Sequence, residues 1–176
     1  MLLLIGASAS GKTEIAKIII KKYNFSKMIT YTTREMRPGE VNGKDYHFIT
    51  KEEFLEKQKN NEFLETTIYN NNYYGTAFKV AERNKVLIVD VNGANRIYKY
   101  LGDKVTIFLL EAPAHVRIQR MKLRGDSDSQ IKSRIENDSK HFVRENIIHV
   151  DYVIETGNKT LDELADSIYN LYIKSI

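Results

Sequence analysis

The sequence predicts an α/β fold in which a parallel core sheet of five strands is flanked by helices. Apolar runs of strand length alternate with helical patterns along the chain, and this order is typical of a parallel sheet with helices on both faces. A glycine-rich octet, GASASGKT at residues 6–13, lies between the first apolar run and the first helical pattern. The 176 residues suit a single domain with its own core.

Each expected element is one segment of this alternation. We expect core strands at residues 2–5, 27–31, 86–91, 105–110 and 152–154. We expect helices at residues 13–22, 77–83, 93–100, 114–124, 128–142 and 161–173. In the last helix, Leu161, Leu164, Ile168 and Leu171 fall on one face, so we expect that face to pack on the core.

Two segments break the alternation. Residues 32–76 contain alternating apolar positions at 45–49, a short helical pattern at 51–59 and a further strand pattern at 62–69, which together predict a small strand-rich insert. Residues 113–136 are rich in arginine and have few apolar anchors, which predicts a helical lid over a bound substrate. The predicted core then consists of residues 1–31, 77–112 and 137–176.

Composition excludes several classes of function. The chain has no cysteine, so disulfides and thiolate chemistry are excluded, and a reducing compartment such as the cytoplasm is expected. No apolar run is long enough to cross a bilayer, so we expect no membrane association. The net charge of +4 is modest, and dense basic stretches and aromatic RNA-binding motifs are absent, so we expect no nucleic-acid partner. The oligomeric state is left open.

The octet fits the pattern G-x-x-x-x-G-K-[ST] and predicts a phosphate-binding loop. Its two glycines allow backbone N–H groups to turn inward around phosphate oxygens, and the start of the next helix adds its positive dipole end. Lys12 can reach the β- and γ-phosphates, and the hydroxyl of Thr13 can bind Mg²⁺. A glycine-rich turn without a ligand is the plainer alternative. We assign phosphate binding to Gly6, Ala7, Ser8, Ala9, Ser10, Gly11, Lys12 and Thr13.

A second group of motifs follows in the insert. Residues 32–48 read TTREMRPGEVNGKDYHF, and FLE and YYGT follow at 63–65 and 73–76. Arg34 and Arg37 lie beside a Pro-Gly turn, where two guanidinium groups could clamp a phosphate or simply face solvent. Together with the octet, these motifs resemble the guanylate kinase family over nearly the whole chain.

The resemblance implies a P-loop nucleoside monophosphate kinase fold that transfers a phosphoryl group from ATP to GMP, or to dGMP, with Mg²⁺ held at Thr13. By position, the residues that hold the GMP phosphate are Arg34, Arg37, Tyr46 and Tyr74. Those that face the guanine are Thr30, Glu65 and Thr76. Guanine carries an N1–H and an amino group side by side, and a carboxylate can accept from both.

The resemblance also assigns the remaining candidates. Lys12, Arg120, Arg124 and Arg134 are the expected catalytic residues, because the family's lid arginines approach the triphosphate. Asp90 is expected on the GMP side or near Mg²⁺-bound water, with a helix cap at Gly93 as its alternative. Arg117 is expected on a solvated helix face.

Some positions depart from the family's usual residues. The resemblance leads us to expect a second acidic residue near Asp90, where this chain has Asn92, and an asparagine beside the adenine, where it has Thr156. Two alternatives therefore stay open: a kinase-like module that binds a partner with weak catalysis, and a related kinase with a different phosphorylated acceptor. The intact phosphate loop and Glu65 favour the GMP-specific enzyme.

Overall fold

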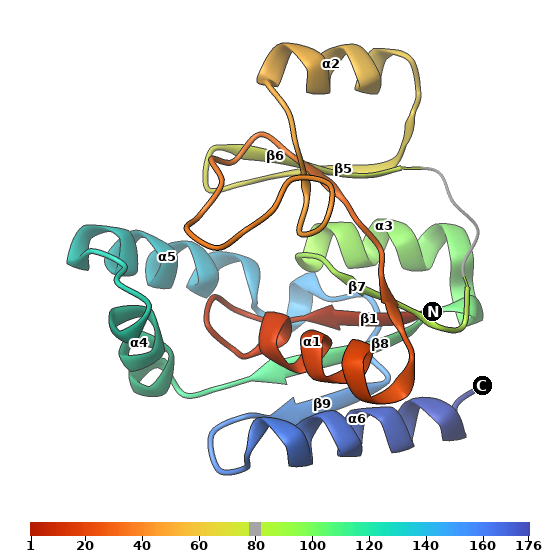
Figure 1. The fold of residues 1–176 in the computed structure, drawn as a ribbon, viewed down its shortest axis with the longest axis vertical. Helices are drawn as coiled ribbons and strands as arrows, with labels where there is room; N and C mark the ends of the chain where they lie inside the picture. Colours follow the sequence, from red (N-terminus) through yellow and green to blue (C-terminus); the bar gives the residue numbers. More distant parts are fainter. Residues whose placement is uncertain (78–81) are drawn as a thin grey trace.

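The computed structural model describes residues 1–77 and 82–176 of the chain. Its core is a five-stranded sheet whose neighbouring strands all pair in parallel (Figure 1). The strand order is β2 (Ser26–Lys27), β7 (Lys85–Ile88), β1 (Leu2–Ile5), β8 (Thr106–Glu111) and β9 (Tyr152–Glu155). The predicted parallel sheet is therefore confirmed.

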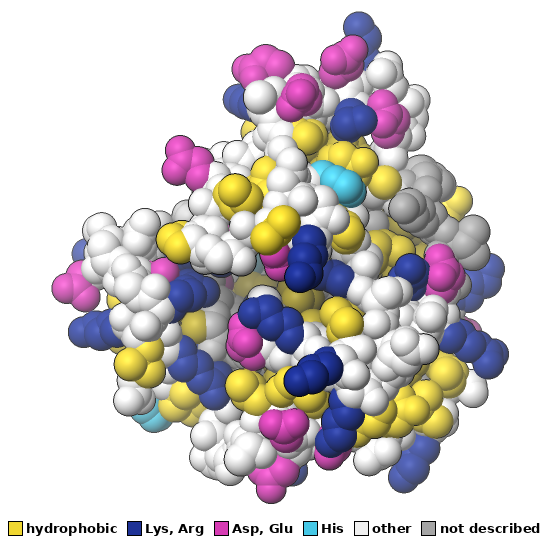
Figure 2. Space-filling view, in the orientation of Figure 1, with side chains coloured by type: hydrophobic (Ala, Val, Ile, Leu, Met, Phe, Trp, Pro, Cys, Tyr) yellow, Lys and Arg dark blue, Asp and Glu magenta, His cyan; other side chains and the backbone are white. Residues whose placement is uncertain are grey.

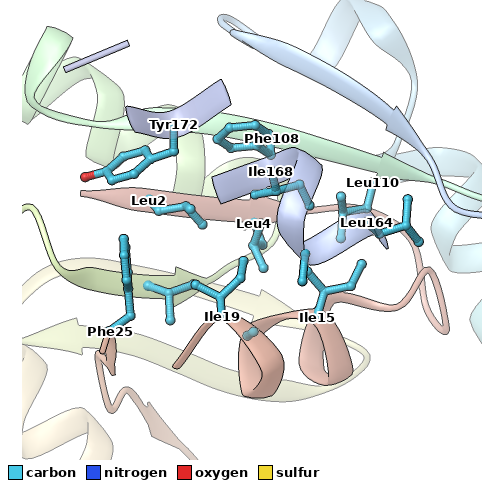
Figure 3. Packing of buried hydrophobic residues seen from close by; sticks show 13 residues of the cluster. Leu2, Leu4, Ile15, Ile19, Phe25, Phe108, Leu110, Leu164, Ile168 and Tyr172 are labelled. Carbon is cyan, nitrogen blue, oxygen red and sulfur yellow. The ribbon is translucent and has the colours of Figure 1, made fainter. Parts of the chain in front are cut away.

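Helices cover both faces of this sheet. On one face lie α1 (Lys12–Tyr23) and α6 (Leu161–Lys174), and on the other lies α3 (Val91–Leu101). Successive residues of β1 point to opposite faces, so Leu2 and Leu4 pack toward α1 and α6 (Figure 3) while Leu3 and Ile5 pack toward α3. Both faces of the central strand are fully buried, as in other parallel sheets.

A smaller sheet stands beyond the core, at the top of Figure 1. Its four strands, in spatial order, are β4 (His47–Phe48), β3 (Tyr31–Thr32), β6 (Asn72–Ala77) and β5 (Phe63–Tyr69). The helix α2 (Lys51–Lys59) packs on this sheet through Phe54, whose ring stacks on Phe63 at a centroid distance of 4.6 Å. The insert therefore has an aromatic core of its own.

Two further α-helices and two short 3₁₀ helices complete the described elements. They are α4 (Ala114–Leu123), α5 (Asp128–His141) and two short 3₁₀ helices, η1 (Gly102–Lys104) and η2 (Arg144–Asn146). The Ser127 side chain caps α5 by accepting a hydrogen bond from the Gln130 N–H, and the side-chain Oε1 of Gln130 accepts one from the backbone N–H of Ser127. None of the helices in the described residues is long and apolar enough to span a membrane.

Three of the expected elements need correction or lie outside the described residues. The strand expected at 27–31 is divided, because β2 ends in the core sheet at Lys27 and β3 begins in the insert sheet at Tyr31. The strand expected at 86–91 ends at Ile88, since Asp90 already caps α3. The helix expected at 77–83 falls mostly on residues 78–81, which lie outside the described residues, and Ala77 itself ends β6.

The contact between α1 and α6 is expected to carry much of the core's stability. Leu164 is 1% exposed within this contact, so Leu164→Ala should lower the free energy of unfolding by about 2–5 kcal/mol through lost burial and an unfilled cavity. Urea denaturation followed by circular dichroism measures this. Ile173→Ala, on the same helix but 46% exposed, is the control and should stay within about 0.5 kcal/mol.

Candidate active site

A cavity of about 450 Å³ lies between the core and the insert. It opens at the carboxyl ends of β1 and β7, the usual ligand position in parallel α/β sheets. Figure 2 shows Lys and Arg side chains gathered around a hollow on this side of the molecule. The cavity is lined by all the predicted site residues except Ala7 and Ser10: Gly6, Ser8, Ala9, Gly11, Lys12, Thr13, Thr30, Arg34, Arg37, Tyr46, Glu65, Tyr74, Thr76, Asp90, Arg120, Arg124 and Arg134.

The phosphate loop lies tightly against the end of β8. Gly6 has φ of +146°, and a Cβ there would approach the Leu110 carbonyl oxygen to 2.3 Å, so no other residue fits without moving the backbone. Gly11 precedes α1 without a side-chain cap, which leaves N–H groups of the first turn available to an anion.

Lys12 folds back over the phosphate loop. Its Nζ donates to the carbonyl oxygens of Gly6 at 2.6 Å and Ala7 at 2.9 Å. Burial lowers the pKa of Lys12 to about 8, while the nearby Asp138 carboxylate acts in the opposite direction. The ammonium group therefore stays largely charged at neutral pH and can move from the carbonyls to phosphate oxygens.

Thr156 is hydrogen-bonded to the backbone of the phosphate loop. It is fully buried, and its hydroxyl donates to the Ser10 carbonyl at 2.8 Å. Arg120 donates to the Thr156 carbonyl through Nη2 at 2.6 Å and to the Ala9 carbonyl through Nη1 at 3.2 Å. The residue that departs from the family's usual asparagine thus connects the loop with a predicted catalytic arginine.

Glu65 lines the cavity, and one of its two carboxylate oxygens has no hydrogen-bond partner among the described residues. The side chain is 4% exposed, and Oε1 accepts from the Thr76 hydroxyl at 2.6 Å across the β5–β6 pair. Oε2 is buried and has no hydrogen-bond partner among the described residues. Burial raises the pKa of Glu65 to about 7, with the Thr76 hydrogen bond opposing. An unpaired buried carboxylate oxygen costs free energy until a ligand donates to it.

Asp90 connects the core to the insert. Its Oδ1 accepts from the Gly93 N–H at 2.8 Å, so the alternative of a helix cap is confirmed, and the side chain also lines the cavity. Its Oδ2 accepts from Thr67 at 2.9 Å. The sequence reasoning missed Thr67, although Glu65, Thr67 and Tyr69 alternate along β5 as residues of one sheet face do. Asn92 is exposed on the first turn of α3, outside the cavity lining.

Cationic groups from the insert converge on the same cavity. The Arg34 guanidinium is held by both carboxylate oxygens of Glu40, at 2.8 and 2.9 Å, and Glu40 also accepts from the Arg37 backbone N–H. Burial, and then the neighbouring arginines, lower the pKa of Arg37. Burial raises the pKa of Tyr46 to about 12, so its hydroxyl remains a hydrogen-bond donor. Sequence reasoning missed Glu40 as a partner of Arg34, although the RPGE motif places it three residues beyond Arg37.

Two of the three lid arginines, Arg124 and Arg134, share one carboxylate. Asp126 accepts from Arg124 and lies 3.6 Å from Nε of Arg134, which is itself buried without a hydrogen-bond partner among the described residues. Arg117 differs from the expectation of a solvated face: its side chain is 12% exposed and pairs with the buried Asp138 at 2.8 Å. Asp138 attracts it because an unpaired buried carboxylate would be costly.

Comparisons with known proteins agree with this geometry. The family model described as guanylate kinase matches residues 1–171. A guanylate kinase of Lactobacillus johnsonii is 35% identical, with 97% of this chain and 86% of the relative aligned. One from Bartonella quintana is 32% identical, with 98% and 80% aligned.

Solved structures show the same relationship. The crystal structure of guanylate kinase from Anaplasma phagocytophilum matches with a TM-score of 0.72 and 28% identity, over 99% of this chain and 84% of that one. A shikimate kinase from Acinetobacter baumannii, with a TM-score of 0.51 and 12% identity over 98% and 92% of the two chains, shares the fold alone. Because the family model spans nearly the whole chain and relatives above 30% identity align over most of their length, this chain belongs to the guanylate kinase family.

Proposed function

We propose that the chain transfers the γ-phosphoryl group of ATP to GMP, giving ADP and GDP, with dGMP as a second acceptor. The observation that carries this proposal is the buried, unpaired Oε2 of Glu65, a residue that lines the same cavity as the phosphate loop. An acceptor that donates two hydrogen bonds to this carboxylate would be selected at one end of the cavity, while the loop holds the donor at the other.

Guanine is the base that suits Glu65. Its N1–H and 2-amino group present two adjacent donors, whereas the corresponding edge of adenine has an unprotonated N1 and no amino group at C2. An adenine base would leave the buried carboxylate unpaired, and a site built for such hydrogen bonds rejects a ligand lacking them by about 10⁴-fold or more. Thr30, 5% exposed, and Thr76 line the cavity beside Glu65 and complete the proposed base site.

The arginines and tyrosines of the insert are the proposed holders of the GMP phosphate. Arg34, Arg37, Tyr46 and Tyr74 line one region of the cavity, with the rings of Tyr46 and Tyr74 6.2 Å apart. Glu40 fixes the Arg34 guanidinium in one direction, which reduces the entropy that the side chain loses when a phosphate binds. Two guanidinium groups and two phenol donors match the several oxygens of a phosphate.

Transfer itself requires positioning and neutralisation of charge. The attacking group is a phosphate oxygen of GMP, which is already anionic, so no general base is needed. Negative charge spreads over the oxygens of the transferring group, and donors fixed in advance stabilise it. Lys12, Arg120, Arg124 and Arg134 are the proposed donors, and the backbone of residues 6–13 holds the ATP phosphates.

Thr13 fits the proposed role of a Mg²⁺ ligand. Its side chain lines the cavity at the start of α1, and a hydroxyl is one of the hard oxygen ligands that Mg²⁺ prefers. The described residues contain no group of three His, Cys, Asp or Glu side chains that could hold a metal ion by themselves. With Thr13 as its protein ligand, the ion would be held mainly by substrate phosphates and water, and it would offset the charge of the phosphates.

Replacing Glu65 tests the assignment of the guanine base. Glu65→Gln presents an amide donor where guanine also donates, so KM for GMP should rise about 10²- to 10⁴-fold while KM for ATP changes little. A coupled assay of ADP release, with GMP, dGMP, AMP, CMP and UMP as acceptors, measures both. Glu62→Gln is the matched control, because Glu62 is exposed and pairs with Lys57 at 2.9 Å.

Two results would contradict the proposal. Unchanged GMP affinity in Glu65→Gln removes Glu65 from the base site. Binding of GMP by the unaltered protein without any turnover in the presence of ATP and Mg²⁺ favours the alternative of a binding module.

The pH dependence of GMP binding follows from the pKa of Glu65. Guanine binds the ionised carboxylate, and with a pKa of about 7 in the free protein this form falls to about a tenth at pH 6. The kcat/KM for GMP should therefore fall about tenfold as the pH is lowered from 8 to 6, because Glu65 becomes protonated over this range. The same profile in Glu65→Gln corrects for ionisation of the GMP phosphate. Equal slopes in the two proteins would contradict the role of this carboxylate.

A further inference from the structure

A buried carboxylate, Asp138 of α5, lies at the meeting point of four segments. Its side chain is 1% exposed. It contacts Ser8 of the phosphate loop, Tyr69 at the end of β5 and Arg117 of α4. Asp138 does not line the main cavity, but it lines a second cavity of about 440 Å³ together with Ala7 and Arg117. We call Asp138, Ser8, Tyr69 and Arg117 the Asp138 cluster.

Both oxygens of this carboxylate face hydrogen-bond donors. Oδ1 accepts from the Tyr69 hydroxyl at 2.6 Å and the Ser8 hydroxyl at 3.3 Å. Oδ2 accepts from the Ser8 backbone N–H at 2.9 Å and from Nη1 of Arg117 at 2.8 Å. A buried network in which all groups are satisfied has one low-energy arrangement, because moving any member leaves a polar atom unpaired.

The protonation of Tyr69 sets the direction of its hydrogen bond to Asp138. Burial, and then the Asp138 charge, raise the pKa of Tyr69, so its hydroxyl keeps its proton and donates it to the carboxylate. The Ser8 hydroxyl lies 3.2 Å from the Tyr69 oxygen and can donate its proton there or to Asp138. Tyr69 and Ser8 are therefore held by the same anion and by each other.

The cluster joins parts of the molecule that serve different substrates. Tyr69 belongs to the same strand as Glu65, the proposed guanine ligand, and Ser8 belongs to the loop proposed to hold ATP. The tip of the β5–β6 hairpin also reaches α5 through Asn70, whose Oδ1 accepts from Ser133 at 3.4 Å. The ring of Tyr69 lies edge-on to His141 of α5, at a centroid distance of 5.9 Å.

We propose that Tyr69 and Asp138 are positioning residues that couple the acceptor half of the site to the donor half. A shift of β5 on GMP binding is transmitted to Ser8, because the two segments share one carboxylate, and ATP binding acts on β5 by the same contacts. This inference rests on the proposed function, since it needs both substrates. By linkage, each substrate then strengthens the binding of the other by the same factor.

The experiment measures that factor directly. Calorimetry gives the Kd of a non-hydrolysable ATP analogue with Mg²⁺, without GMP and with saturating GMP, and the ratio of the two values is the coupling factor. In the unaltered protein it should exceed about fivefold, the lower range of measured couplings. Tyr69→Phe removes only the hydroxyl, and Asp138→Asn removes the charge and replaces one acceptor oxygen with an amide donor. Both should bring the factor close to one and lower kcat.

A matched control separates coupling from stability. The Tyr23 hydroxyl donates to Asp166 at 2.6 Å, the same kind of bond at the same distance, between α1 and α6 and away from the cavity. Tyr23→Phe should leave the coupling factor and kcat unchanged. The double variant Tyr69→Phe/Asp138→Asn should lose no more coupling than either single variant, because the two residues act as one unit.

The possible results are distinct. A coupling factor of one in the unaltered protein overturns the proposal. The proposal is also overturned if Tyr69→Phe keeps the full coupling factor and only the unfolding midpoint of this variant falls. If Asp138→Asn does not fold, Tyr69→Phe decides the question, since its ring and packing are retained. Absence of GMP-dependent ADP release in the unaltered protein contradicts the proposed function instead, and the binding measurements show which of the two has failed.

Discussion

The close approach of the phosphate loop to the end of β8 is the constraint on which the site depends. At Gly6 the loop backbone packs directly on the Leu110 carbonyl, where a Cβ would stand 2.3 Å away. This contact directs the chain from β1 into the loop and then into α1, whose first turn lies open to an anion. Thr156 holds the same loop in two ways: its hydroxyl donates to the Ser10 carbonyl, and its own carbonyl accepts from Arg120, which also binds the loop.

The second constraint is the cost of burying carboxylates. Glu65 leaves one oxygen unpaired and has a raised pKa, so free energy remains to be gained when a ligand donates to it. Asp138 is also buried, but both of its oxygens accept hydrogen bonds within the protein, so it needs no ligand. The two buried carboxylates thus have opposite roles: Glu65, which lines the main cavity, is available for recognition, and Asp138, which does not line it, holds structure.

Carboxylates also pair with the clustered arginines around the site. Glu40 holds Arg34, Asp126 holds Arg124 and Arg134, and Asp138 holds Arg117. Each anion limits the repulsion among clustered cations and fixes the direction of the guanidinium groups before a phosphate arrives. The Nε of Arg134 is buried, lies 3.6 Å from Asp126 and has no hydrogen-bond partner in the described residues.

Local sequence patterns were sufficient for the parts of the protein that depend on neighbours along the chain. The alternation of apolar runs and helical patterns predicted the five-stranded parallel sheet, and the spacing of the glycines with Lys12 predicted the phosphate loop between β1 and α1. The division of the 27–31 segment between two sheets was not predictable. The two ends of the segment pair with different strands, and those strands are distant in sequence.

The sequence by itself determined the fold class, the phosphate loop and the candidate residues of both substrate halves. Only the tertiary structure decided which charges are buried and which groups they face. Arg117 was expected in solvent and Asp138 had no assigned role, yet Asp138 meets Ser8 across 130 positions of the chain. The physical reason is that burial and pairing are set by segments far apart in sequence, and no local pattern specifies which of them meet.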